Sequence, residues 1–211
     1  GIDVFFGPPL GTGANNHRIL STTALGGSGN NINYPSPAVS CDGNRIAFGT
    51  KAQLSLADTD ADWDLYVYGL NVGIAELLRG PSNQSLRPLE VAISASGYFI
   101  AVETQERVDP SDSDNFRDVI LAPYSEERSL GELTLISQRN GVKGNQNSVD
   151  MSVSDTGAVV FRSSATNLVD PGQASGNDIL LNSAAEPEEP RRPFDPAVIL
   201  LILNGNDQDG M

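Results

Sequence analysis

Four aspartates in this chain each open a short apolar run of the kind that forms a β-strand. They are Asp3, Asp64, Asp118 and Asp178, and the runs cover residues 3–6, 64–67, 118–121 and 178–181. The aspartates lie 61, 54 and 60 residues apart, and a motif that returns at a nearly fixed interval marks a protein built from stacked repeats. The spacing therefore predicts a repeat fold more firmly than it predicts a function.

A second repeated feature precedes three of these runs and predicts a tight hairpin. A glycine, at position 43, 97 or 157, separates a short run of small apolar residues from a second strand. A serine stands three positions before each glycine, at 40, 94 and 154. Because a tight hairpin turn needs a positive φ that glycine adopts at little cost, we expect each complete unit to begin with strand, turn and strand.

Together these patterns predict an all-β fold, a β-propeller of four-stranded antiparallel blades. Helical periodicity is almost absent, since no stretch of a dozen residues keeps it free of Gly, Pro or Asn. We expect about three complete blades plus a partial one. The predicted segments are a partial blade at 1–35, blades at 36–83, 84–141 and 142–183, a Pro- and Glu-rich linker at 184–196, and an apolar strand with a polar tail at 197–211.

The repeat resembles a known family. Residues 154–170 followed by 177–180, and residues 40–48 followed by 64–68, are similar to the TolB-like (WD-like) propeller repeat, and the resemblance extends over about 36–182. The middle unit departs from the pattern, with Ser96 where an aspartate is expected. The family includes periplasmic scaffolds, cell-surface repeat proteins and propeller domains of hydrolases, so the resemblance implies binding or scaffolding more often than catalysis.

The charge of the chain limits its partners. Lys and Arg number 13 against 27 Asp and Glu, a formal net charge of −14, which repels nucleic acid and anionic membrane surfaces. The longest fully apolar run, 197–203, has seven residues, far short of the roughly 20 that span a bilayer. The single cysteine, Cys41, excludes an intramolecular disulfide, and we expect its thiol to be buried. The composition favours an exported, extracytoplasmic protein, located in the periplasm, at the cell surface or outside the cell. It also favours a prokaryotic origin.

Two acidic loops are the candidate metal sites. Asp58, Asp60, Asp62 and Asp64 alternate along the first loop, and Asp109, Asp112, Asp114 and Asp118 form a looser set in the second. Oxygen-only ligand sets of this kind suit calcium. The alternative is that the aspartates cap backbone NH groups in turns and hold no ion. The first loop also lacks the glycine and glutamate that an EF-hand requires.

The sequence offers little to an enzyme, and we predict a non-catalytic protein. His17 is the only histidine, so a Ser-His-Asp triad would rest on it alone and a three-histidine zinc site is excluded. Paired carboxylates remain open, because their spatial separation decides whether they hydrolyse a glycan. The alternatives to a scaffold are therefore a glycan-active, carboxylate-dependent hydrolase and a calcium-stabilised cell-surface repeat module.

The partial first blade predicts either a fragment of a longer propeller or the use of a strand from another molecule. Propellers normally close their ring, since open sheet edges invite pairing with other chains. The candidate strand to complete a blade, either in cis as the fourth strand of the last unit or in trans as a donor to another molecule, is made of Ala197, Val198, Ile199, Leu200, Leu201, Ile202 and Leu203. If it completes a blade in trans, the expected function is protein–protein binding or self-assembly, with the chain as a filament subunit whose partner is itself.

Overall fold

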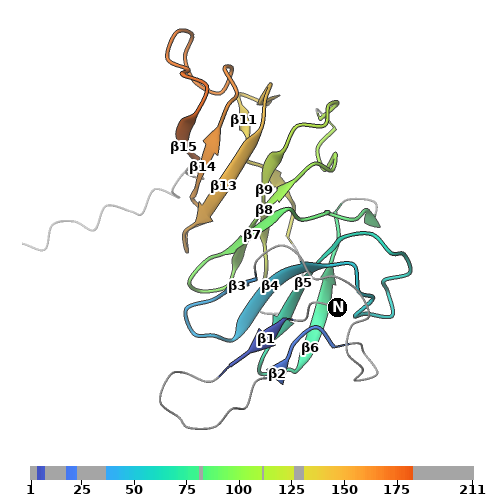
Figure 1. Ribbon diagram of the computed structural model, residues 1–211. Helices are drawn as coiled ribbons and strands as arrows, with labels where there is room; N and C mark the ends of the chain where they lie inside the picture. The colour runs from blue at the N-terminus through green and yellow to red at the C-terminus, as the bar shows by residue number, and fades with distance from the viewer. Residues whose placement is uncertain are drawn as a thin grey trace, which may run out of the picture.

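The chain forms consecutive antiparallel sheets joined by turns and loops (Figure 1). The structure, a computed structural model, describes residues 4–7, 18–22, 37–80, 83–110, 112–125 and 131–182. These residues form no α-helix, and none of them builds a helix with the length and apolar character that a membrane crossing demands.

Two sheets have four strands that follow one another in chain order. The first contains β3 (Ala38–Val39), β4 (Arg45–Thr50), β5 (Asp64–Gly69) and β6 (Ile74–Leu78). The second contains β7 (Glu90–Ile93), β8 (Phe99–Thr104), β9 (Asp118–Pro123) and β10 (Thr134–Leu135). All neighbours pair antiparallel. The predicted all-β fold of four-stranded propeller blades is confirmed.

Two further sheets lie at the two ends of this stack. A two-stranded sheet pairs β1 (Phe5–Phe6) with β2 (Arg18–Ile19). A third sheet orders β13 (Ser148–Val153), β14 (Val159–Ser163) and β15 (Asp178–Asn182). The fourth strand predicted for this sheet, at 197–203, lies outside the described residues, as does His17.

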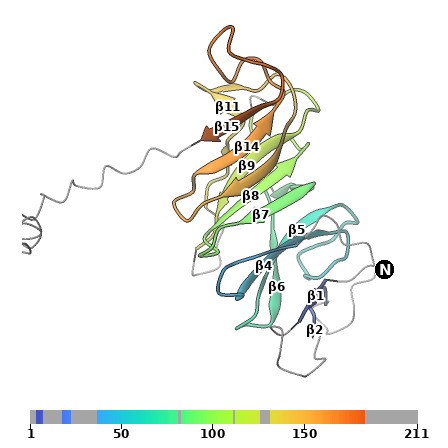
Figure 2. The same ribbon diagram turned by 60° about the vertical axis from the view of Figure 1, so that its left-hand side comes forward.

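The sheets lie one on top of another (Figure 2), and the side chains between them form three apolar layers. Phe48 and Tyr66 pack with Val4 and Leu20, which flank β1 and β2. The next layer joins the first sheet to the second, and the last joins the second sheet to the third. Alternate residues along β4, β5, β8 and β9 face opposite layers, as the period of a strand requires. Both faces of the middle sheets are therefore covered.

The predicted hairpin turns are confirmed at all three positions. Gly43, Gly97 and Gly157 have φ of 72°, 77° and 80°, and each donates its N–H to the carbonyl of the serine three residues earlier. The serine hydroxyl in turn accepts a backbone N–H from the start of the second strand. The Ser and Gly of the repeat are thus explained by turn geometry.

Consecutive turns are also bonded to one another. Cys41 N donates to Ala95 O at 2.8 Å, and Ser96 N donates to Asp155 Oδ1 at 2.6 Å. Arg45 Nη1 reaches Gly97 O at 3.1 Å. Contrary to expectation, Cys41 is exposed, because it lies at the tip of a turn and its backbone, not its side chain, makes the contact between sheets.

One hairpin was not predicted. β11 (Gln138–Arg139) pairs with β12 (Val142–Lys143) around Asn140 and Gly141, whose φ angles are 52° and 76°. Asn-Gly at the centre of a two-residue turn is a strong local hairpin signal, because both positions need positive φ. The hairpin follows β10 and carries Lys143 toward the second acidic loop.

Candidate functional site

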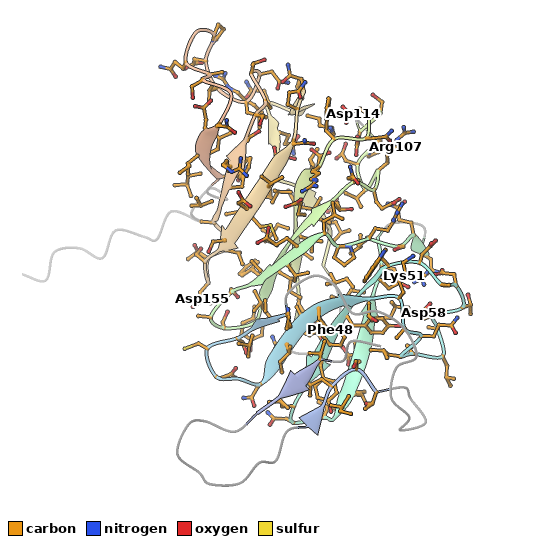
Figure 3. The ribbon with its side chains drawn as sticks, in the orientation of Figure 1. Phe48, Lys51, Asp58, Arg107, Asp114 and Asp155 are labelled. Atoms are coloured by element: carbon orange, nitrogen blue, oxygen red, sulfur yellow. The ribbon has the colours of Figure 1, made fainter. Side chains whose placement is uncertain are left out.

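Both acidic loops lie at the same end of the sheets. The first connects β4 to β5 and the second connects β8 to β9, and the strands place them in register: Thr50 pairs with Asp64, and Thr104 with Asp118. Figure 3 shows the labelled Asp58 and Asp114 on one side of the molecule, with Asp155 of the hairpin turns on the other. This end of the sheets, called here the loop end, gathers most of the candidate site.

In the first loop three carboxylates surround one guanidinium. Arg79, which follows β6, places Nη2 at 3.3 Å from Asp58 Oδ1, 3.2 Å from Asp60 Oδ2 and 3.0 Å from Asp64 Oδ2. Asp58 also accepts the Tyr66 hydroxyl at 2.7 Å. The side chains of Asp58 and Asp64 are only 1% and 0% exposed, so these two carboxylates are shielded from water, whereas Asp60 at the rim of the network is 41% exposed.

The second loop repeats the arrangement with lysine. Lys143 Nζ lies 2.8 Å from Asp114 Oδ1, 3.0 Å from Asp118 Oδ2 and 3.6 Å from Asp112 Oδ1. Ser137 donates its hydroxyl to Asp118 Oδ1 at 2.7 Å. The side chains of Asp112, Asp118 and Lys143 are again buried. Two neighbouring blades therefore hold the same cluster of three carboxylates and one cation.

Burial decides how the carboxylates titrate. Loss of hydration raises the pKa of Asp64 to about 7 despite the opposing charge of Arg79, and it raises the pKa of Asp118 to about 6 against hydrogen bonds from Ser137 and Lys143. Asp60 differs, because the backbone N–H of Asp62 and the Arg79 side chain hold its pKa below the usual value. Asp64 and Asp118 are thus easier to protonate than Asp60.

The structure groups some of the predicted calcium ligands and leaves others out. The carboxylate clusters consist of Asp58, Asp60 and Asp64, and of Asp112, Asp114 and Asp118. Neither grouping includes Asp62 or Asp109. In both clusters a side-chain cation contacts the oxygens that a metal ion would need. Calcium at these loops stays a prediction, and the geometry favours the internal cation.

Two signals in the sequence distinguish the cluster members. Both loops read Asp-x-Asp-x-x-x-Asp, at 58–64 and at 112–118, which selects the observed aspartates. The counter-cations were missed, because they come from different places: Arg79 immediately follows a fourth strand, whereas Lys143 arrives on an inserted hairpin. Only the Asn-Gly turn before Lys143 gives a local hint of the second.

A groove lies beside the clusters at the loop end. Its larger part, of 440 Å³, is lined by Gln84, Arg87, Gln105, Glu106, Arg107 and Asn115. Its smaller part, of 190 Å³, is lined by Trp63, Arg87, Pro88, Leu89 and Gln105. Arg87 and Gln105 border both parts, so we treat them as one groove, called here the Trp63 groove. It combines two arginines with an aromatic ring.

A different kind of surface covers the outer side of the third sheet. Ile179 and Leu181 on β15 are 77% and 66% exposed, and Val160 on β14 is 40% exposed. Strand register places Val160 beside Leu181 and Arg162 beside Ile179 on one face, and Arg162 is ion-paired with Asp150. The opposite face, with Phe161, packs on the second sheet. Val160, Ile179 and Leu181 form what is called here the outer apolar face.

The corresponding positions in the other sheets are buried. Ile179 directly follows Asp178, as Leu65 follows Asp64 and Val119 follows Asp118, and both of these are 0% exposed. Two residues further along each strand, Val67 and Leu121 are 1% and 6% exposed. The third sheet therefore has apolar side chains at positions that are packed against a neighbouring sheet elsewhere in the chain, but among the described residues no sheet packs on them.

Comparison with solved structures finds β-propeller proteins that are similar to this chain. TolB from Acinetobacter baumannii shares 13% identity with a TM-score of 0.46, over 83% of this chain and 34% of TolB. A prolyl endopeptidase shares 15% identity with a TM-score of 0.47, over 82% and 24%. The tricorn protease shares 10% identity with a TM-score of 0.42, over 70% and 12%.

These similarities concern the fold alone. The chain spans about a third of the length of TolB and less of the two proteases. TolB, whose repeat the sequence resembles, is among the similar structures. No protein-family model and no curated protein sequence matches the chain.

Proposed function

We propose that this protein is a non-catalytic β-propeller scaffold that acts by self-association, outside the cytoplasm. The observation that carries the proposal is the outer apolar face, since Ile179 and Leu181 are exposed at positions that are buried in both other sheets. Exposed apolar side chains that gather on one sheet face cost free energy in water and favour an interaction with another molecule. A second copy carries the same kind of apolar sheet face that covers the equivalent positions within the chain.

The acidic clusters support binding over catalysis. A hydrolase needs carboxylates that touch substrate, whereas the side chains of Asp58 and Asp64 are 1% and 0% exposed and those of Asp112 and Asp118 are 2% and 1% exposed. Their oxygens are turned toward Arg79 and Lys143. We therefore assign these clusters to holding the loop end together.

The edge of the third sheet offers a second contact for assembly. β15 pairs with β14 on one side, and among the described residues no strand pairs with its other side, where β5 and β9 have β6 and β10. An unpaired edge accepts an added strand through backbone hydrogen bonds. The proposed donor is the apolar run 197–203 of another copy.

Light scattering over a range of concentrations tests self-association. The average mass of the wild-type chain should rise with concentration, and the double variant Ile179→Asp/Leu181→Asp should associate only at clearly higher concentration, because charge is buried unpaired in the interface. Leu56→Asp is the matched control, since Leu56 is 82% exposed but lies in a loop. A wild-type chain that stays monomeric up to high micromolar concentration overturns the proposal.

Deleting residues 197–211 separates the two contacts. If strand donation drives assembly, the truncated chain is monomeric while its outer apolar face is intact. If the truncated chain still associates and loses association on Ile179→Asp/Leu181→Asp, the face alone forms the interface and strand donation is wrong.

A further inference from the structure

The Trp63 groove has the features of a peptide-binding site. Its larger part holds the guanidinium groups of Arg87 and Arg107 and one acidic side chain, Glu106. Within a chain of net charge −14, this is a local excess of positive charge. The smaller part adds Trp63 and Pro88 as an apolar niche.

Arg87 is held at the junction of the two parts in an unfavourable backbone conformation. Its φ is 36°, a value that residues with a side chain rarely adopt, and it precedes Pro88, which restricts it further. Its N–H is fixed by Trp63 O at 3.2 Å and Ser85 Oγ at 3.1 Å. Strain of this kind is retained where the fold fixes a side chain in a particular place.

The arginine side chains still have donors to offer a ligand. Arg87 is 55% exposed and, among the described residues, its guanidinium bonds Glu106 Oε1 at 3.0 Å through Nη1. Arg107 bonds Ser113 O at 3.3 Å through Nη2. Each guanidinium has five N–H donors, and a carboxylate binds such groups well. The amide nitrogens of Gln84 and Gln105, in contrast, are already bonded to backbone carbonyls.

We propose that the Trp63 groove binds the Pro- and Glu-rich segment 184–196 of a second copy of this chain. The segment carries Glu186, Glu188 and Glu189 among prolines 187, 190, 193 and 196. Proline-rich peptides favour an extended conformation that docks on aromatic grooves. Glutamates of the segment pair with Arg87 and Arg107, while a proline packs on Trp63.

We take the donor to be a second copy, in line with the proposed self-association. β15 pairs Asp178 with Ser163 and Asn182 with Val159, so it runs from the loop end to the hairpin end and directs the chain away from the groove. Within one chain, the segment would have to turn back along the sheet directly after β15, against the extended conformation that its prolines favour. Between copies no such reversal is needed, and the contact is head to tail.

This inference rests on the proposed self-association, and it adds a second, separable contact. The interface through the outer apolar face involves the third sheet, whereas the groove lies on the loops of the first two. A variant of one surface leaves the other unchanged.

Binding of a synthetic peptide tests the inference. A fluorescein-labelled peptide of residues 184–196 is titrated with the full chain carrying Glu186→Gln/Glu188→Gln/Glu189→Gln, so that its own segment does not compete. We expect a Kd in the range of tens to hundreds of micromolar by anisotropy, together with a change in Trp63 emission. Trp63 is the sole tryptophan, so emission reports the groove directly.

Two substitutions decide whether binding uses the groove. Arg87→Gln and Arg107→Gln should each weaken the peptide at least fivefold, and Arg139→Gln, an exposed arginine paired with Asp170, should leave the Kd unchanged. The receptor with Ile179→Asp/Leu181→Asp should bind the peptide as before. No binding at 1 mM peptide, or equal binding by Arg87→Gln, overturns the inference, and light scattering of the wild type then still reports separately on the proposed function.

Discussion

At the scale of single residues, the stability of the loop end rests on two buried cations that each face three carboxylates. Arg79 and Lys143 differ in chemistry and in origin along the chain, yet they reach equivalent positions. Placing several charges in a shielded site costs free energy unless they compensate one another. Removing one cation therefore affects folding far more than removing an exposed arginine.

Replacing Arg79 by methionine tests this compensation. Arg79→Met keeps the length and packing of the side chain but leaves Asp58 and Asp64 buried without a cation, so the free energy of unfolding should fall by about 3 kcal/mol. Urea unfolding measures it. Arg139→Met is the control, since this exposed pair should contribute at most about 1 kcal/mol. Equal effects from the two variants would contradict the account.

The same variant tests the calcium prediction. With Arg79 present, 5 mM calcium or a chelator should leave the Tm of the wild type unchanged. In Arg79→Met the three carboxylates lack a cation, and calcium should raise the Tm because it binds the folded state. A wild-type Tm that falls on adding a chelator would show that calcium binds beside Arg79, contrary to what we expect.

The raised pKa of Asp64 predicts a specific pH dependence. Its pKa is about 7 in the folded state against 3.8 in the unfolded chain. Between these values the folded state binds more protons, so this group's contribution to stability is present below pH 4 and is lost as the pH rises to 7. Asparagine cannot ionise. The free energy of unfolding of Asp64→Asn, measured relative to that of the wild type, should therefore rise by at least about 1 kcal/mol from pH 4.5 to pH 7.5.

A carboxylate with a lowered pKa provides the opposite control. Asp155 accepts the backbone N–H of Ser96, and this hydrogen bond lowers its pKa. Its contribution is present above pH 4 and is lost as the pH falls, so Asp155→Asn should change relative stability in the reverse direction. Parallel pH profiles of the two variants would exclude the assigned causes.

At the scale of elements, the hairpin turns both reverse the chain and join one sheet to the next. Gly43 and Gly97 occupy the same turn position with similar positive φ. A Cβ on Gly43 would meet nothing within 4 Å, whereas one on Gly97 would lie 2.7 Å from Arg45 Cδ. Arg45 at this point also stacks over Tyr98 and Tyr124.

The pair Gly43→Ala and Gly97→Ala separates backbone strain from the contact between sheets. Gly43→Ala should cost about 1 kcal/mol, the price of positive φ alone. Gly97→Ala should cost at least about 1 kcal/mol more, because Arg45 must also move. Thermal or urea unfolding of both variants measures the difference. Equal losses would mean that the turns do not transmit packing from one sheet to the next.

The elements that the sequence predicted well are those whose signals are local. Serine and glycine fix the turn, and the Asp-aliphatic runs become β5, β9 and β15, because strand and turn geometry act over a few residues. The β11–β12 hairpin was also locally encoded, by Asn140 and Gly141, and was overlooked. The partners of the acidic loops were not predictable in this way, since Arg79 and Lys143 approach from elements whose positions depend on packing between strands.

At the scale of the whole molecule, the sheets form a series in which each one is covered by the next. The Phe48 side of the first sheet packs on residues next to β1 and β2, and the middle sheets are covered on both faces. The series ends, among the described residues, at Val160, Ile179 and Leu181. Our central claim is that another copy of the chain covers this face.

Thiol labelling at the outer apolar face tests that claim most directly. Ile179→Cys is made in a Cys41→Ser background, so that the chain has one thiol, and its labelling rate is measured at low and at high protein concentration. We predict that labelling slows at least tenfold at the concentrations where light scattering shows association, because the thiol becomes buried. An unchanged labelling rate in the associated protein would contradict the claim.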